Sequence, residues 1–151
     1  MSDIDAITQL MAIEQIKQLK ARYFRSIDTK DFVLLRAVFT DDAQFDVRCS
    51  LTMEPDMEGN GYHEGGDAIT AFIAGAVLPR RCMHHGHCHE IELLSETTAR
   101  GVIAMEDMVW NGDNLSLIFH GMGHYHETYA KVDGAWRIKT LRLSRVHVIL
   151  G

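Results

Sequence analysis

Residues 80–93, RRCMHHGHCHEIEL, begin the half of the chain that decides the fold. From this stretch onward, segments typical of β-strands alternate with short turn-forming sequences such as NGD and VDG. Four strands are predicted, over residues 83–95, 97–113, 115–134 and 135–150. Because short turns join antiparallel neighbours, the sequence predicts that these strands form an antiparallel sheet.

The first part of the chain is predicted to be helical. Apolar residues recur at helical spacing, with charged residues between them, at Ile16, Leu19, Tyr23 and Ile27. This pattern predicts an amphipathic helix from about Asp3 to Ile27. Asp28 and Asp31 follow as good capping residues, and a short second helix is predicted over residues 32–39.

Three further segments complete the predicted fold. Residues 40–47 contain a turn and a strand, and residues 53–66 form a loop rich in glycine and aspartate. Residues 67–79 form a third helix, which Asp67 caps and Pro79 ends. The order of these elements predicts an α+β fold with the helices on one face of a curved sheet.

The composition is typical of a single globular domain that covers residues 1–151. The net charge is −6 and the basic residues are scattered, which argues against nucleic acid or an anionic membrane as a partner. No apolar run is long enough to span a bilayer, and the first residues lack the features of a secretory signal. The cysteines are odd in number and lack C-x-x-C spacing, so free thiols in a cytoplasmic protein are predicted for Cys49, Cys82 and Cys88.

Five stretches of the sequence carry a resemblance to a known family: residues 16–32, 39–47, 83–91, 101–110 and 126–138. With them, the chain resembles the nuclear transport factor 2-like superfamily and its SnoaL-like enzymes over nearly its whole length. Bile-acid 7α-dehydratases, scytalone dehydratases and hexachlorocyclohexane dehydrochlorinases are the members nearest in pattern. The resemblance implies a cone-shaped α+β barrel whose deep apolar pocket holds an Asp–His pair and needs no cofactor.

Asp28 and His84 are the first two candidate catalytic residues. From the residues alone, an aspartate at this position most simply caps the next helix, and a histidine in a polar strand is usually exposed. The resemblance instead implies that Asp28 orients His84, and that His84 removes a proton from carbon. The ordinary pKa of histidine, about 6.5, suits that role near neutral pH.

Tyr23 and Asp107 complete the candidate set, because these positions also match the bile-acid dehydratase pattern. The Tyr23 hydroxyl can hydrogen-bond a substrate oxygen, or the ring can simply pack in the core. Asp107 alternates with Met105 and Val109 on a predicted strand, where a buried acid needs a partner. Its neighbour Glu106 is expected on the opposite face of the strand.

Strand alternation conflicts with an inward-facing His84. Counting back from the apolar end of the strand places His85, His87 and His89 inward and leaves His84 outward. A β-bulge near Gly86 would exchange the two faces and bring His84 inward.

A metal site is the rival explanation for the histidines. Five of them on two predicted strands offer ligands for Zn, Fe or Mn: His85, His87, His89, His124 and His126. The H-x-H motif is weak, however, and no carboxylate follows at the spacing typical of cupin sites. The resemblance implies no metal, so none is predicted.

These observations predict a cofactor-independent lyase that carries out a dehydratase-type elimination on a hydrophobic cyclic molecule, polyketide-like or steroid-like. A related isomerase or epoxide hydrolase is one alternative, and a non-catalytic ligand-binding or subunit-type member of the superfamily is another. An Asp28–His84 pair within hydrogen-bond reach inside a closed pocket favours the enzyme. A filled cone, or an Asp28 bound only to backbone, favours the binder.

The chain is also expected to form a homo-oligomer, with a trimer preferred. Apolar residues occur at both parities of the last two strands: Leu115, Leu117 and Phe119 against Ile118, and Leu141 and Leu143 against Ile138, Val146 and Val148. Strands that are apolar on both sides are expected to be covered on both sides. The sequence supports association, and the resemblance to trimeric enzymes supplies the number.

Overall fold

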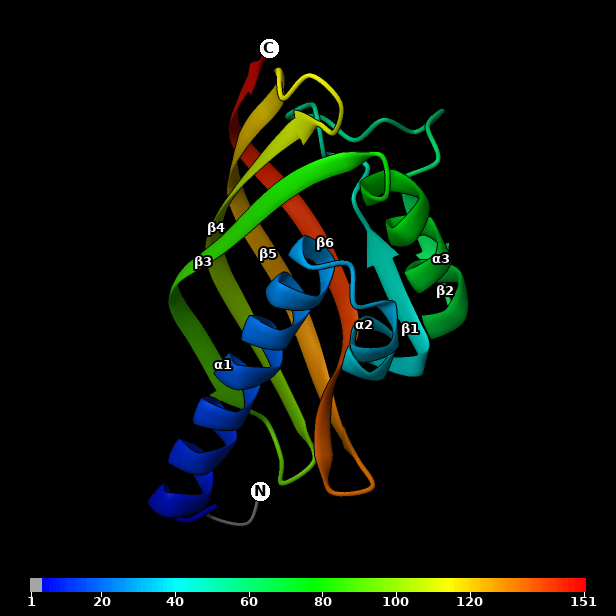
Figure 1. Cartoon of the computed structure of the whole chain (residues 1–151). Coiled ribbons are helices and arrows are strands. Elements are labelled where there is room, and N and C mark those ends of the chain that lie inside the picture. The colour runs from blue at the N-terminus through cyan, green and yellow to red at the C-terminus, as the bar shows by residue number, and fades with distance from the viewer. Residues whose placement is uncertain (1–3) are drawn as a thin grey trace.

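The computed structural model describes residues 4–151, which form three helices and a six-stranded sheet (Figure 1). The helices are α1 (Ala6–Asp28), α2 (Phe32–Val38) and α3 (Gly66–Val77). The strands are β1 (Phe39–Asp46), β2 (Tyr62–Glu64), β3 (Arg80–Leu93), β4 (Thr98–Asn111), β5 (Leu117–Val132) and β6 (Ala135–Leu150). The predicted helix start near Asp3 lies outside the described residues. None of the helices in the described range is long and apolar enough to cross a membrane.

The strands form one curved, open sheet in the order β2-β1-β6-β5-β4-β3. Strands β3 to β6 are antiparallel neighbours, as predicted. β1, however, runs parallel to β6, with Phe45 opposite Leu141, so the sheet as a whole is mixed. β2 lies inside the predicted loop and pairs with β1. Because most of the chain separates β1 from β6, no local turn signal predicts their pairing.

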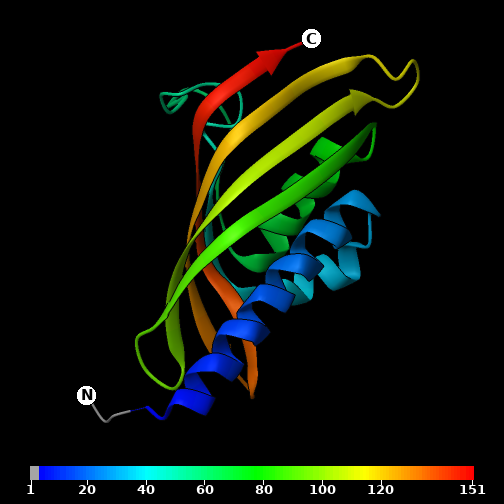
Figure 2. The ribbon, with the colours of Figure 1, turned by 90° about the vertical axis from the view of Figure 1, so that its left-hand side faces the viewer.

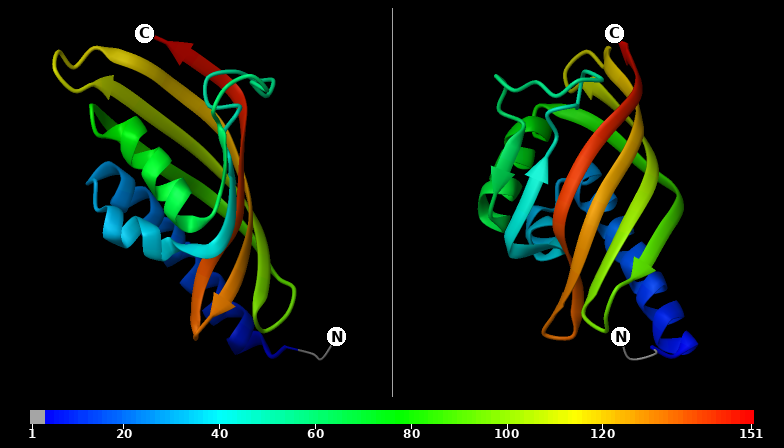
Figure 3. Two further views of the ribbon diagram at one scale, coloured as in Figure 1. Left: turned by 90° about the vertical axis from the view of Figure 1, so that its right-hand side faces the viewer. Right: turned by 180° about the vertical axis from the view of Figure 1, so that it is seen from behind.

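All three helices lie on the same side of the curved sheet, as predicted (Figure 2 and Figure 3). We call the sheet face that packs against them the inner face and the opposite one the outer face. The buried side of α1 contains the apolar residues that the helical spacing predicts: Ile16, Leu19, Tyr23 and Ile27. Full burial of an aliphatic side chain stabilises by about 1.5–3 kcal/mol, so this stripe fixes α1 across the sheet.

The capping of α2 leaves Asp28 available for another role. Asp31 accepts a hydrogen bond from the backbone N–H of Leu34 at 3.0 Å and caps α2, as predicted. Asp28 is the last residue of α1, and its carboxylate binds His84 instead of an amide of α2. Asp31 therefore caps α2, although the sequence alone allows either Asp28 or Asp31 to do so.

The start of α3 corrects the predicted cap. Its N-cap is Gly65, with a φ of 92° that favours glycine. Asp67 lies in the first turn, where a negative charge is favourable, and its carboxylate accepts a hydrogen bond from Arg36 Nε at 2.6 Å. Asp67 thus acts as a first-turn acid and not as the cap.

A β-bulge in β3 decides which histidines face the helices. The register with β4 shifts after His87, and Cys88 has a left-handed φ of 46°. Before the bulge, His84 therefore faces inward, while His85 and His87 face outward. The exchange of faces by a bulge near Gly86 is confirmed, and the bulge lies two residues further along, at Cys88. The inward assignment of His85 and His87 is wrong, because alternation cannot be counted through an extra residue.

A second irregularity changes the interpretation of β6. The register with β5 shifts within the strand. As a result Ile138, Leu141 and Leu143 are all buried in the core, although they differ in parity. The two-sided apolar pattern is therefore partly an effect of this shift, and Ile138 does not belong to the outer face. Val146 does, and it is 66% exposed.

Candidate active site

A cavity of about 260 Å³ lies between the helices and the inner face of the sheet. Much of its wall is apolar, including Ile27, Phe45, Phe72, Val109, Phe119 and Leu143. Several polar or ionisable side chains also line it, among them Tyr23, His84, Asp107, Tyr125 and Arg145. An apolar pocket with a few convergent polar groups is the usual form of a small-molecule site.

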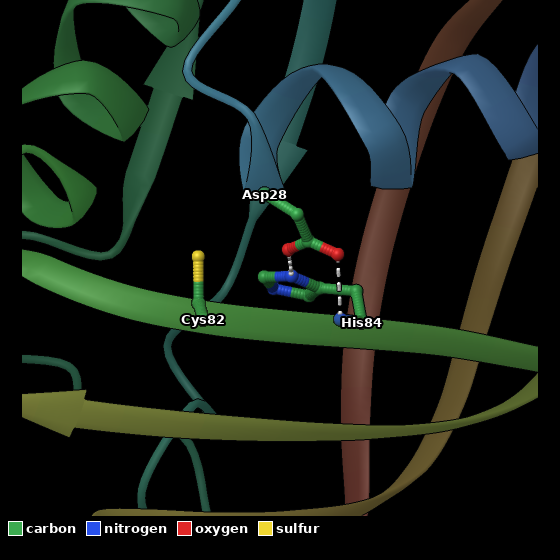
Figure 4. Close-up of side chains that lie close together, drawn as sticks. All are labelled: Asp28, Cys82 and His84. Carbon is green, nitrogen blue, oxygen red and sulfur yellow. Dashed lines mark hydrogen bonds and ion pairs between the residues drawn. The ribbon is translucent and has the colours of Figure 1, made fainter. Parts of the chain in front are cut away.

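Asp28 and His84 form a hydrogen-bonded pair beside this cavity (Figure 4). Oδ1 of Asp28 lies 2.6 Å from Nδ1 of His84, and Oδ2 accepts from the His84 backbone N–H at 3.0 Å. The two side chains are only 12% and 11% exposed. Because the carboxylate accepts, we assign the imidazole proton to Nδ1, which leaves Nε2 with a free lone pair. This is the tautomer in which a cavity-lining histidine can act as a base.

Gly86, two residues after His84, allows the Phe24 ring to pack closely against this part of β3. The Phe24 ring stacks on the His84 ring, with centroids 6.2 Å apart and an interplanar angle of 16°. A Cβ atom at Gly86 would lie 2.6 Å from the Phe24 ring, far inside van der Waals contact. The glycine therefore lets α1 approach β3 closely enough for Asp28 to reach His84.

Asp107 approaches the same imidazole from the neighbouring strand. It is opposite His84 in the β3–β4 ladder, and its Oδ2 lies 3.9 Å from His84 Nε2. Its partner is Arg145 on β6, with Nη1 2.8 Å from Oδ1 and Nη2 donating to Oδ2 at 3.1 Å. The Arg145 side chain has no exposed surface, so the ion pair is buried. Asp107 thus has the partner that its buried position requires.

Arg145 is not among the residues predicted from the sequence. The available signal was its parity, because it alternates with Leu141 and Leu143, which face the core. Gly121 provides the space, since a Cβ atom there would lie 2.4 Å from Cζ of Arg145. Oδ1 of Asp107 contacts the guanidinium but has no hydrogen-bond partner. That oxygen is buried, and the charge of the Arg145 guanidinium compensates it.

Tyr23 and Tyr125 form a second polar part of the cavity wall. Their rings are 5.9 Å apart in an edge-to-face arrangement, and each is only 2% exposed. Burial, followed by the charge of Glu127, raises the pKa of Tyr23, and burial raises the pKa of Tyr125. Both hydroxyls therefore remain protonated at neutral pH and can act as donors. Tyr23 is at its predicted place, whereas Tyr125 was not predicted.

One group of described residues could hold a metal ion: Asp28, Cys82 and His84 (Figure 4). One ligand atom from each lies within 4.8 Å of the others, and carboxylate, thiolate and imidazole are all zinc ligands. Here, however, the carboxylate and the imidazole already bind each other, and burial raises the pKa of the Cys82 thiol to about 12. An ion would have to displace the thiol proton and compete with the hydrogen bond between the carboxylate and the imidazole. All three cysteines are free, as predicted.

The rival histidine site is not assembled. His85 Nδ1 and His87 Nε2 lie 3.7 Å and 3.4 Å from Glu106 Oε1 on the outer face, and His126 Nε2 lies 2.8 Å from a serine hydroxyl. Within residues 4–151, no group of three metal ligands combines His85 or His87 with His124 or His126. Glu106 faces away from the cavity, as predicted.

Comparison with known proteins supports the fold described above. Residues 8–142 match the model of the SnoaL-like domain. The chain is similar to a provisionally named scytalone dehydratase from Novosphingobium aromaticivorans, with a TM-score of 0.81 and 21% identity over 97% of this chain and 92% of that one. It is similar to a type 2 hexachlorocyclohexane dehydrochlorinase, with a TM-score of 0.78 and 18% identity over 97% and 93% of the two chains. A Mycobacterium tuberculosis protein of unknown function gives a TM-score of 0.73 and 25% identity over 91% and 77%.

Proposed function

The chain belongs to the SnoaL-like domain family, and from that premise we propose that it is a cofactor-independent lyase of the dehydratase type. One observation carries the proposal: the Asp28–His84 pair, 2.6 Å apart, stands beside an apolar cavity that is not filled by side chains. The Asp28 carboxylate binds the imidazole as well as a backbone amide, as an orienting role requires. The names of two similar structures, a dehydratase and a dehydrochlorinase, both denote eliminations and support the same class of reaction.

In the proposed reaction, His84 Nε2 takes a proton from a carbon atom next to a carbonyl group. The electron pair of the C–H bond becomes the new C=C bond, while the bond from the neighbouring carbon to its hydroxyl group breaks with its electron pair. The departing hydroxyl takes this proton from the His84 imidazolium and leaves as water, so His84 returns to the neutral state. Asp28 stabilises the imidazolium that exists between the two proton transfers.

The remaining polar groups are proposed to hold the substrate and the departing oxygen. Tyr23 is a protonated donor in the cavity wall, and its hydroxyl can stabilise negative charge that develops on that oxygen. Asp107 lines the cavity with its Oδ2 3.9 Å from His84 Nε2, and Arg145 compensates its charge. The volume of about 260 Å³ is close to the lower limit of ligand pockets, which favours a compact cyclic substrate.

The test is a turnover assay on a panel of cyclic β-hydroxy carbonyl compounds with the wild type and two variants. Asp28→Asn and His84→Ala are each expected to lower turnover by about a hundredfold or more without loss of folding. Asp31→Asn, a neutralised aspartate three residues away that still caps α2, is the matched control and should retain activity. Near-normal turnover by both site variants would refute the proposal.

We also infer that the chain forms a homotrimer through the outer face of its sheet. Three apolar side chains remain exposed there: Met83 at 43%, Val146 at 66% and Ile149 at 46%. The family resemblance supplies the number, and the outer face supplies a surface without helices to cover it. Light scattering should give about three times the chain mass, and a mass near 17.1 kDa would contradict the inference.

A further inference from the structure

Lys20 and Glu127 form an ion pair that the proposed chemistry does not use. Lys20 lies on α1 and Glu127 on β5, and neither side chain has any exposed surface. Lys20 Nζ donates to Oε1 of Glu127, and the Tyr129 hydroxyl donates to Oε2 at 2.7 Å. The pair is thus fully enclosed and its carboxylate is bound on both oxygens.

Stability alone does not account for such a pair. Desolvation of two charges generally offsets their attraction, and well-packed neutral residues of similar volume often stabilise a core as much or more. Both residues are buried in the core between α1 and β5. A role in the adjacent cavity is a better explanation for retaining two charges here.

The surroundings of the ammonium group point to that role. Lys20 Nζ lies 3.7 Å from the ring centroid of Tyr23 and 3.7 Å from that of Tyr125. An ammonium group has three N–H donors, so with one on Glu127 it can direct the other two at these two ring faces. Both tyrosines line the cavity, whereas Lys20 does not. The ammonium group therefore contacts the rings of both tyrosines, whose hydroxyls are the donors that a bound molecule would meet.

We propose that the Lys20–Glu127 pair is a positioning element for the active site, which fixes the rings of Tyr23 and Tyr125 and places a cation against both ring faces. A cation against the face of a phenol attracts π-electron density away from the oxygen, so the O–H group becomes a better donor. The carboxylate of Glu127, whose charge raises the pKa of Tyr23, acts in the opposite direction, and the cation offsets that effect. Glu127 holds the cation in register with both rings. The role in turnover rests on the proposed lyase function, but the effect on the tyrosines does not.

The charge on Lys20 depends on pH. Burial lowers the pKa of Lys20 to about 8, and the charge of Glu127 opposes that decrease. The other titratable groups facing Lys20 are Tyr23, Tyr125 and His89 on β3, whose pKa burial lowers first and nearby lysines lower further. The ammonium group is therefore present at neutral pH and is lost as the pH rises through about 8. Turnover that depends on this charge should fall over the same range.

The experiment removes both charges while keeping the shape, with Lys20→Met/Glu127→Gln. The single variant Lys20→Met is avoided because it would leave Glu127 buried without a partner. The double variant should fold, with kcat reduced about tenfold, KM nearly unchanged and the decline above about pH 8 absent. The matched control introduces Lys20→Met/Glu127→Gln into an enzyme that already carries Tyr23→Phe/Tyr125→Phe. There, the added pair of substitutions should alter kcat by less than about twofold. An equal loss in both backgrounds, or no loss in the first, would overturn the proposal.

A second measurement needs no substrate. The 13Cζ resonances of Tyr23 and Tyr125 report electron density at the phenol, and both should shift when Lys20 and Glu127 are neutralised. Tyr62, which is 42% exposed and far from the pair in the fold, serves as the internal control. Unchanged resonances for both cavity tyrosines would refute the proposal even if the lyase assignment holds. Shifted resonances with no detectable turnover would instead place the error in the lyase assignment.

Discussion

The two faces of β3 and β4 carry the same types of residue in different surroundings. On the inner face, His84 is opposite Asp107, and Asp28 adds a second carboxylate at 2.6 Å. On the outer face, the next residues along each strand are also opposite each other, His85 and Glu106. Glu106 lies 3.0 Å from a third histidine, His120, and its side chain is 33% exposed. One step along the strand thus separates two histidine–carboxylate groups.

The difference teaches that surroundings, and not residue type, decide what such a group can do. The outer group is open to solvent, so its ion pairs are screened and contribute little. The inner group is buried, is held by a helix end, and borders a cavity. Only there does a histidine have a fixed tautomer, an orienting carboxylate and space for a reacting molecule. The predictions below test this contrast.

The largest expected difference is in stability. Arg145→Met leaves Asp107 buried without its partner, which should lower the free energy of unfolding by about 3–5 kcal/mol. Glu106→Gln on the outer face should lower it only slightly. Urea denaturation of the two variants measures both values. Equal destabilisation would show that the two faces do not differ as described.

The next effect concerns the donors of the inner face. Tyr23→Phe removes one hydroxyl from the cavity and should lower kcat about tenfold to a hundredfold, because a donor to the departing oxygen is lost. Tyr62→Phe removes a hydroxyl that binds Glu64 at the surface and should leave kcat unchanged. Steady-state kinetics on both variants separates a specific role from a general sensitivity to loss of a tyrosine hydroxyl. A Tyr23→Phe enzyme with normal kcat would remove Tyr23 from the mechanism.

A smaller effect is expected from acid titration of the outer face. The hydrogen bond from His120 is the main cause that lowers the pKa of Glu106 below its ordinary value of 4.5. A carboxyl group with a lowered folded-state pKa stabilises the fold above its unfolded pKa and loses that contribution as the pH falls through the folded value. Glu106→Gln should therefore remove a small part of the decline in thermal stability below about pH 4.5. Identical melting profiles for the variant and the wild type would contradict this.

The smallest expected effect is that of chelators. Turnover should persist after chelation, because the Asp28 carboxylate and the His84 imidazole bind each other and burial keeps the nearby Cys82 thiol protonated. Added Zn2+ should inhibit, since it would remove both groups from proton transfer, and Cys82→Ser should weaken that inhibition. Loss of activity on chelation, restored by a metal, would identify Asp28, Cys82 and His84 as metal ligands.

The sequence predicted most of the fold because most of its signals are local. The helical spacing of apolar residues identified α1, and short turn-forming sequences identified the antiparallel strands. The parallel β1–β6 pair was missed because it joins distant segments. The cap of α3 was assigned to Asp67 because sequence alone does not reveal that Arg36 binds it.

The site was predicted in part for similar reasons. The contact of Asp28 with His84 agrees with what the resemblance implied, and the burial of Asp107 agrees with its alternation with Met105 and Val109. The bulge was predicted near Gly86 and lies at Cys88, because one extra residue in an alternating polar segment has no local sequence signal that fixes its exact position. Arg145 was overlooked because a charged residue on a strand is usually taken as exposed, although its parity indicated the core. Lys20 is one of the charged residues that lie between the apolar ones of the predicted first helix, and such residues are usually taken as exposed for the same reason.

The most direct test of the central claim compares His84→Gln with His85→Gln in one assay. The two substitutions are identical and adjacent, but they fall on opposite faces of β3. The inner variant should lose about a hundredfold or more in turnover, and the outer variant should stay within about twofold of the wild type. Equal activities for the two variants, or a greater loss for His85→Gln, would contradict the assignment of catalysis to the inner face.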